Sequence, residues 1–239
     1  MTDRQTAILS AIVELYAKTA EPVGSQALVD RFETSSATIR AEMAELEAAG
    51  YIMQPHISAG RIPTDKGYRV YVNALSDERQ PLHHAPEPTI SRINQLVAKR
   101  LSSVDQAERA IKVATGVLTE VTHNLGLATL SDSIYLHGMA SLFSQPEFFG
   151  GRRAYEVARL LDSLDEWLDE AAPADRVSVY IGRENPVGKS SGCSLIIARF
   201  ASPYSDHSYI GVLGPTRQNY GQVINLVDYT GRMLQEALA

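Results

Sequence analysis

The stretch VGSQALVDRFETSSATIRAEMAELEAAGYIMQPHISAGRIPTDKGYRVYV, residues 23–72, decides the fold of the N-terminal part of this chain. Ser25 is a favourable N-cap for a short helix over residues 25–32. Residues 34–36 are all hydroxylated and can cap a second helix of about fourteen residues, which Gly50 ends. Two short helices joined by a tight turn predict a helix-turn-helix.

The second half of the stretch predicts a β-wing. Residues 51–53 are suited to a strand, residues 58–60 to a turn, and residues 61–63 leave that turn. Thr64 can then cap a closing helix. The apolar side chains that we expect in the core of this domain are Ile8, Ile12, Leu15 and Tyr16 of a preceding helix (residues 4–19), then Ala27, Leu28, Phe32, Ile39, Met43, Leu46, Tyr68, Tyr71, Val72 and Leu75.

The second helix of a helix-turn-helix commonly enters the major groove of DNA. Net charge argues against DNA binding at first sight, because the chain has a net charge of −6 and residues 1–80 contain 8 Lys and Arg against 11 Asp and Glu. Binding to phosphates must therefore depend on local positive charge. The first turns of the second helix present small or hydroxylated residues and one Arg, namely Ser36, Ala37, Thr38, Arg40 and Ala41. Glu42, Glu45 and Glu47 lie toward its other end. A capped, solvated helix in another kind of small bundle remains an alternative at this point.

Composition limits the other classes of function. No apolar segment approaches the ~20 residues of a membrane span, and the N-terminus lacks a signal segment, so we expect a cytoplasmic protein without membrane contact. The single cysteine, Cys193, excludes an internal disulfide and predicts a buried structural thiol. We expect no metal, no cofactor and no catalysis, because Asp206 and His207 have no nucleophile-elbow sequence beside them.

A polar, proline-containing linker over residues 76–88 predicts a boundary between a domain at 1–75 and another at 89–239. The linker pair His83 and His84 is expected to be solvated. Apolar heptads then predict two helices, over residues 89–101 and 103–124, which pack on a domain core, pair across a dimer, or do both. Further on, we expect strands at 133–137, 177–181, 193–200 and 208–213 and helices at 153–171 and 218–237.

Most of the chain resembles HrcA, a family of bacterial heat-inducible transcription repressors. In chain order the matching blocks are EPVGSQALVDRF, SSATIRAEMAELEAAGYIMQPHISAGRIPTDKGYRVYV, YLHGMASLFSQPEF, VYIGRENP and IGVLGPTRQNYGQVINLVDY. The resemblance implies an α+β chain in which a winged helix-turn-helix precedes a GAF-like antiparallel sheet domain with flanking helices. It also implies a homodimer on double-stranded DNA that carries an inverted-repeat operator called CIRCE, before heat-shock chaperone operons, and help from the chaperonin GroEL. A regulator that senses a ligand through the GAF-like domain, and a winged helix that contacts protein instead of DNA, are the alternatives.

Carried over by position, the resemblance together with the local charge gives a set of expected DNA-binding residues. Arg40 and Thr38 are expected at base edges or adjacent phosphates, Ser36 at a phosphate, and Arg61 at the backbone or minor groove. Ala41 and Ile57 replace the family's usual Asn and Thr, so operator preference is expected to differ. The full set is Ser35, Ser36, Thr38, Arg40, His56, Ser58, Gly60, Arg61, Thr64, Lys66 and Arg69.

The largest departure from the family lies between the helix at residues 103–124 and the YLHGMASL block. Other members have further GAF-like strands and an inserted dimerisation domain there, whereas this chain passes almost directly from one block to the next. We therefore expect a reduced GAF-like domain with fewer strands. A dimer is still expected, because one winged helix contacts only a half-site.

Overall fold

The structure is a computed structural model that describes residues 1–77, 91, 104–131, 133–149, 151–171, 176–186, 188–189 and 191–238. The chain divides into two compact units, of which the first joins the N-terminal residues with Thr216–Asn219. Most of the predicted linker, including His83 and His84, and nearly all of the predicted helix at 89–101 lie outside the described residues. No helix in the described ranges is long and apolar enough to span a membrane.

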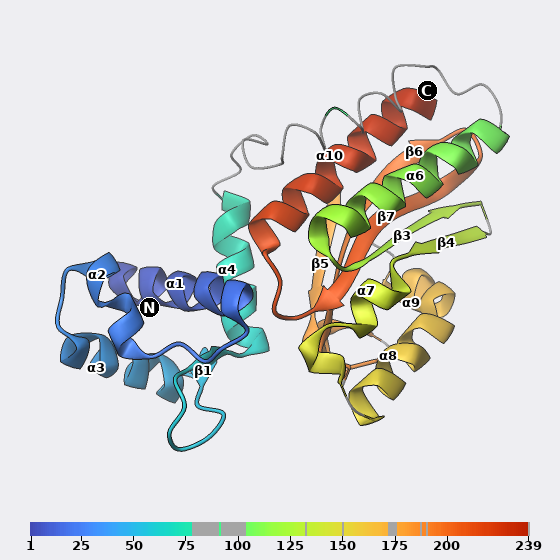
Figure 1. Cartoon of the computed structure of the whole chain (residues 1–239). Helices are drawn as coiled ribbons and strands as arrows, with labels where there is room; N and C mark the ends of the chain where they lie inside the picture. Colours follow the sequence, from blue (N-terminus) through green and yellow to red (C-terminus); the bar gives the residue numbers. More distant parts are fainter. Residues whose placement is uncertain are drawn as a thin grey trace. The chain divides into compact units, whose positions relative to one another are not determined.

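The first unit is a winged helix-turn-helix, as predicted (Figure 1). Ile52 pairs with Pro63 and Met53 with Ile62 in the antiparallel wing. Ile8, Ile12, Leu28, Ile39, Leu46, Ile52 and Tyr68 form the centre of its core, and each is at most 2% exposed. Its elements are α1 (Asp3–Thr19), η1 (Ser25–Leu28), α2 (Val29–Phe32), α3 (Ser36–Ala48), β1 (Ile52–Met53), β2 (Ile62–Pro63) and α4 (Asp65–Asp77).

Local capping explains where these helices begin and end. Ser35 caps α3, and Gly50 follows its end with a φ of 76°, a conformation that favours glycine.

The expectation that Ser25 caps a single helix over 25–32 was wrong. That segment is a 3-10 turn followed by one short α-helix, and Gly24 occupies the cap position without a side-chain bond. The Ser25 hydroxyl bonds Ser36 instead.

The second unit contains a five-stranded antiparallel sheet with the order β4-β3-β7-β6-β5. The arrangement is consistent with the GAF-like fold. The predicted strands were confirmed with small shifts at their ends. Its elements are α6 (Val104–Thr122), β3 (Leu125–Leu130), β4 (Ser133–His137), α7 (Met139–Phe143), η2 (Pro146–Phe148), α8 (Gly151–Asp162), α9 (Leu164–Ala171), β5 (Val177–Ile181), η3 (Gly182–Glu184), β6 (Cys193–Ser202), β7 (Ser205–Pro215) and α10 (Tyr220–Leu238).

Helices cover both faces of this sheet (Figure 1). On one face lie α6 and α10, and Gly231 of α10 approaches the side chains of Ala198 and Ile210. On the other face, helices α7 to α9 pack around the fully buried Trp167. Cys193 belongs to this second core, and burial raises the pKa of its thiol to about 12. The expectation of a buried, structural thiol was therefore confirmed.

Strand β3 was missed by the sequence analysis. All six of its residues are buried, so the segment LGLATL lacks the alternation of apolar and polar residues that indicates a half-buried strand. It pairs antiparallel with β4, and Leu130 lies opposite Ser133. The predicted helix over 153–171 is two helices, which meet at Ser163.

Candidate nucleic-acid interface

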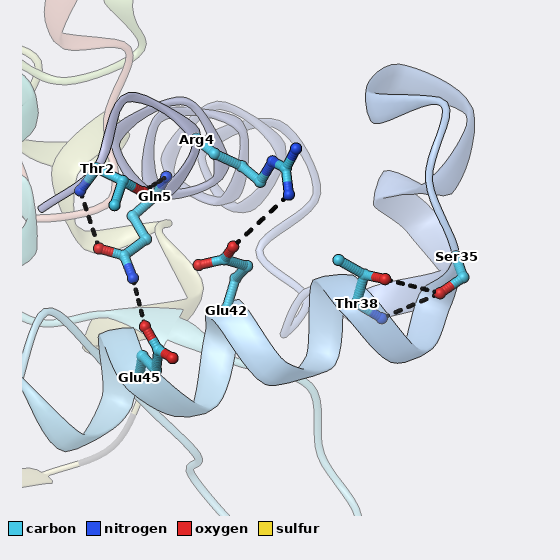
Figure 2. Close-up of polar contacts among 7 residues, drawn as sticks. All are labelled: Thr2, Arg4, Gln5, Ser35, Thr38, Glu42 and Glu45. Carbon is cyan, nitrogen blue, oxygen red and sulfur yellow. Dashed lines mark hydrogen bonds and ion pairs between the residues drawn. The ribbon is translucent and has the colours of Figure 1, made fainter.

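The start of the recognition helix α3 is fixed by two hydroxylated residues. The Ser35 side chain accepts a hydrogen bond from the Thr38 backbone N–H at 3.1 Å, and the two hydroxyl groups lie 2.9 Å apart (Figure 2). Thr38 was expected at a base edge or an adjacent phosphate, and its hydroxyl is engaged in this cap. The Ser36 hydroxyl is similarly engaged, because it bonds the Ser25 hydroxyl at 2.8 Å and ties the two helices of the motif together.

Arg40 lies on the exposed face of α3, and its guanidinium has no partner among the described residues. The exposed residues around it, Ala37, Ala41 and Ala44, follow helical spacing and share this face. Small side chains allow a helix backbone to approach base edges closely, and a single Arg among them supplies donors that match guanine. Ile39, expected in the core, is fully buried.

The three acidic residues of α3 are held by partners on other elements. Arg4 of α1 lies 4.0 Å from Glu42. Gln5 donates to Glu45 at 2.6 Å and also accepts from the Thr2 backbone in a capping box (Figure 2). These contacts place the carboxylates of Glu42 and Glu45 against α1, so the objection from charge is weaker than the sequence alone indicates.

Glu47 is the third of these acids, and its partners are on the wing. One carboxylate oxygen accepts from the Gln54 backbone N–H at 3.0 Å, and the other lies 2.9 Å from both Nε and a terminal nitrogen of Arg61. Arg61, expected at the DNA backbone or minor groove, is therefore engaged inside the domain. The Arg61 side chain is 22% exposed.

The tip of the wing is shaped by one side chain that the sequence analysis missed. The Gln54 amide donates to the carbonyl oxygens of Ile57 and Ala59, both at 2.9 Å. Ile57 is 95% exposed, and His56 and Ser58 beside it are exposed as well. No spacing rule indicates such a role for Gln54, because its partners are carbonyl groups of a loop whose path depends on the fold.

Thr64 and Lys66, expected to bind DNA, make contacts within the domain. The Thr64 hydroxyl donates to the Gly50 carbonyl at 2.7 Å and accepts from the Gly67 backbone, which confirms Thr64 as the cap of α4. The Lys66 ammonium donates to the Ala49 carbonyl at 2.9 Å and lies 4.3 Å from the centre of the Tyr51 ring. Lys66 thus supplies positive charge at the C-terminal end of α3.

The remaining predicted residues differ in their exposure. Arg69 is half-buried on α4. Gly60 lies against the backbone of Pro22 and Val23, where a Cβ would meet carbonyl groups. Of the described cationic side chains in the first unit, Lys18, Arg40 and His56 have no polar partner. Of the predicted set, Arg40, His56 and Ser58 are therefore exposed without a side-chain partner among the described residues, whereas Ser35 and Lys66 are exposed but have partners within the domain.

Near α4, burial and the negative charge of Glu14 raise the pKa of Tyr71 to about 12, and the charge of Arg31 opposes this shift. Arg31 and Glu14 form an ion pair at 2.7 Å. Tyr71 is consequently an uncharged part of the core and adds no charge to the surface.

Two family models match the chain. One, described as the winged helix-turn-helix transcription repressor HrcA DNA-binding domain, matches residues 1–76, and another, the HrcA protein C-terminal domain, matches residues 82–224. The heat-inducible transcription repressor HrcA of Geobacter sulfurreducens is 27% identical over 336 aligned positions, which cover 100% of this chain and 98% of that protein. The repressor of the same name from Brevibacillus brevis is 27% identical over 338 positions, with the same coverage.

The alignments are longer than the chain. Because 336 positions are aligned and the chain has 239 residues, at least 97 positions have no residue here. Among solved structures, one described as a hypothetical protein at 2.2 Å resolution has a TM-score of 0.79 and 20% identity, and covers 100% of this chain and 98% of that chain. That likeness shows that the fold is shared.

Proposed function

The chain belongs to the HrcA family of heat-inducible transcription repressors, and we propose that it binds an inverted-repeat operator of the CIRCE type as a homodimer and represses chaperone operons. The observation that carries the proposal is the exposed face of α3. Arg40 lies there among three alanines and has no partner among the described residues, whereas every acidic residue of the helix has a partner on another element.

Physical chemistry supports contact through this face. The N-terminus of α3 carries positive partial charge, which favours a nearby phosphate. Arg40 adds a full positive charge and donors that match the guanine edge in the major groove. The wing tip, with His56 and Ser58 exposed, is suited to the adjacent backbone or minor groove.

The test is a titration of the full chain with two labelled duplexes. One carries the inverted repeat found before the chaperone genes of the source genome, and the other carries the same bases in scrambled order. We expect binding to the repeat to be at least about a thousandfold tighter at physiological salt. Equal affinity for both duplexes would exclude a sequence-specific repressor.

Dimerisation follows from the symmetry of the proposed operator. A winged helix contacts one half-site, and two copies related by a two-fold axis match an inverted repeat and combine their affinities. The chain has at least 97 fewer residues than the aligned length of its relatives, so its dimer contacts need not coincide with theirs.

The proposal includes assistance by the chaperonin GroEL. Under this hypothesis, unfolded proteins occupy the chaperonin during heat stress, the repressor fails to reach its active form, and the operons are expressed. Denatured chain is refolded with and without chaperonin, and the yield of operator-binding protein is compared. The hypothesis predicts a higher yield with chaperonin, and equal yields would contradict it.

A further inference from the structure

Three residues from separate parts of the first unit meet where the wing joins the recognition helix. Glu47 lies in the last turn of α3, Gln54 follows β1, and Arg61 precedes β2. Both carboxylate oxygens of Glu47 are used, one by the Gln54 backbone and the other by two nitrogens of Arg61. We refer to Glu47, Gln54 and Arg61 as the wing junction.

The position of Glu47 needs an explanation, because negative charge is unfavourable at the C-terminal end of a helix. α3 has no basic residue in its own last turn. The compensating positive charges come from Arg61 and from Lys66, which donates to the Ala49 carbonyl. The acid at position 47 is therefore compensated by Arg61, 14 positions away in sequence, while Lys66 of α4 binds a carbonyl at the same end of the helix.

Arg61 is held at its backbone as well as at its side chain. Its N–H and carbonyl form two hydrogen bonds with Val23, each of 2.9 Å. Gln54, the third member, fixes the other arm of the wing through Ile57 and Ala59. The wing junction thus connects both arms of the wing to α3, so the orientation of the wing depends on that of α3.

We propose that Glu47 and Arg61 are positioning residues, which fix the wing relative to the recognition helix so that both meet the same duplex. The inference rests on the proposed DNA binding of this domain. It replaces direct phosphate contact by Arg61 with an indirect role: Arg61 acts through Glu47, and Arg40 and the wing tip make the contacts.

The variant Glu47→Ala distinguishes a direct phosphate contact by Arg61 from a positioning role, because the two roles predict opposite changes in DNA affinity. If Arg61 contacts phosphate, Glu47→Ala releases the guanidinium and removes a negative charge, so DNA binding becomes tighter. If the pair positions the wing, Glu47→Ala weakens binding. We expect a loss of about five- to tenfold, the order of a partly exposed ion pair with hydrogen bonds.

Arg61→Ala gives an independent measurement. A lost phosphate contact lowers the slope of log affinity against log salt by about one unit. We expect instead an unchanged slope, with a loss similar to that of Glu47→Ala. The double variant should bind about as weakly as Glu47→Ala alone, because Glu47→Ala already breaks the contact with Arg61. Arg61→Lys retains the charge and one donor, so it should restore part of the affinity.

Control variants separate this effect from misfolding and from a general change in charge. Glu21→Ala removes an exposed carboxylate that has no partner among the described residues, and its binding should be unchanged or slightly tighter. Glu47→Gln retains an acceptor for the Gln54 backbone N–H. If Glu47→Ala does not fold, Glu47→Gln shows whether DNA affinity rises or falls when the charge of Glu47 is removed. Hydroxyl-radical footprints should lose protection where the wing lies and retain it in the recognition-helix segment.

The full chain is titrated with the inverted-repeat duplex and with the scrambled duplex. Tighter binding by Glu47→Ala, or a salt slope lowered by about one unit in Arg61→Ala, would overturn the positioning role. Failure of the repressor proposal appears differently, as equal affinity of the unaltered chain for both duplexes. In that case the affinity change of Glu47→Ala and the salt slope of Arg61→Ala are still measured on either duplex.

Discussion

Arg40 illustrates how one side chain determines what a surface can recognise. It is exposed on α3, its guanidinium has no partner among the described residues, and small residues surround it. An arginine that already holds an acid must break that contact before it binds a base. Arg40 has no such contact to break.

Arg40→Ala should therefore reduce discrimination between the inverted repeat and the scrambled duplex by about 1 to 3 kcal/mol, because a bidentate contact to guanine is lost. The measurement is the ratio of the two dissociation constants. Lys18→Ala is the matched control, since Lys18 is also exposed and has no partner in the described part of the chain, but lies on α1. An unchanged ratio for Arg40→Ala would remove Arg40 from the base-contacting residues.

Gly60 is required by a close approach of two backbones. A Cβ at this position would meet the carbonyl groups of Pro22 and Val23, which cannot move aside as a flexible side chain does. Gly60→Ala should destabilise the wing by about 1 to 3 kcal/mol. Hydrogen exchange at the paired amides of Val23 and Arg61 should accelerate accordingly.

Gly24→Ala is the matched control for Gly60→Ala. A Cβ at Gly24 has no atom within 4 Å, so exchange at the same amides should change little. Equal protection in both variants would show that the wing accommodates a methyl group at position 60.

At the scale of elements, the recognition helix depends on its cap. Ser35→Ala removes the acceptor for the Thr38 N–H and should cost about 1 kcal/mol. Amides in the first turn of α3 should exchange faster, and operator affinity should fall with them. Ser58→Ala removes an exposed hydroxyl without a partner among the described residues. It serves as the control for amide exchange in α3 only, because Ser58 belongs to the wing tip that is proposed to contact DNA. No change in exchange for Ser35→Ala would mean that Thr34 or Ser36 replaces the cap.

The same scale shows which elements the sequence predicts and which it does not. Helix α3 was predicted because its cap, its buried face and the glycine that follows it are local signals. Strand β3 was missed because it is buried on both faces and lacks alternation. Its burial depends on how α6 and α7 pack against it and on its pairing with β7, which is remote in sequence.

At the scale of the whole molecule, the proposed operator requires two copies of the chain. Sedimentation equilibrium should show a dimer at micromolar concentration. A duplex with one half-site should bind far more weakly than the inverted repeat, because the second contact is lost. If the protein is monomeric both free and on the repeat, the homodimer is excluded.

The sequence by itself determined the type and order of most described elements, which depend on caps, turns and periodicity within a few residues of each position. The resemblance of its sequence blocks to HrcA indicated the family and the candidate interface. Only the tertiary structure shows which candidate side chains have partners inside the domain. Gln5 and Glu45 are 40 positions apart, and Glu47 and Arg61 are 14 apart. Such partners meet only when the chain folds, and a charged side chain that has found a partner must give up that contact before it binds DNA.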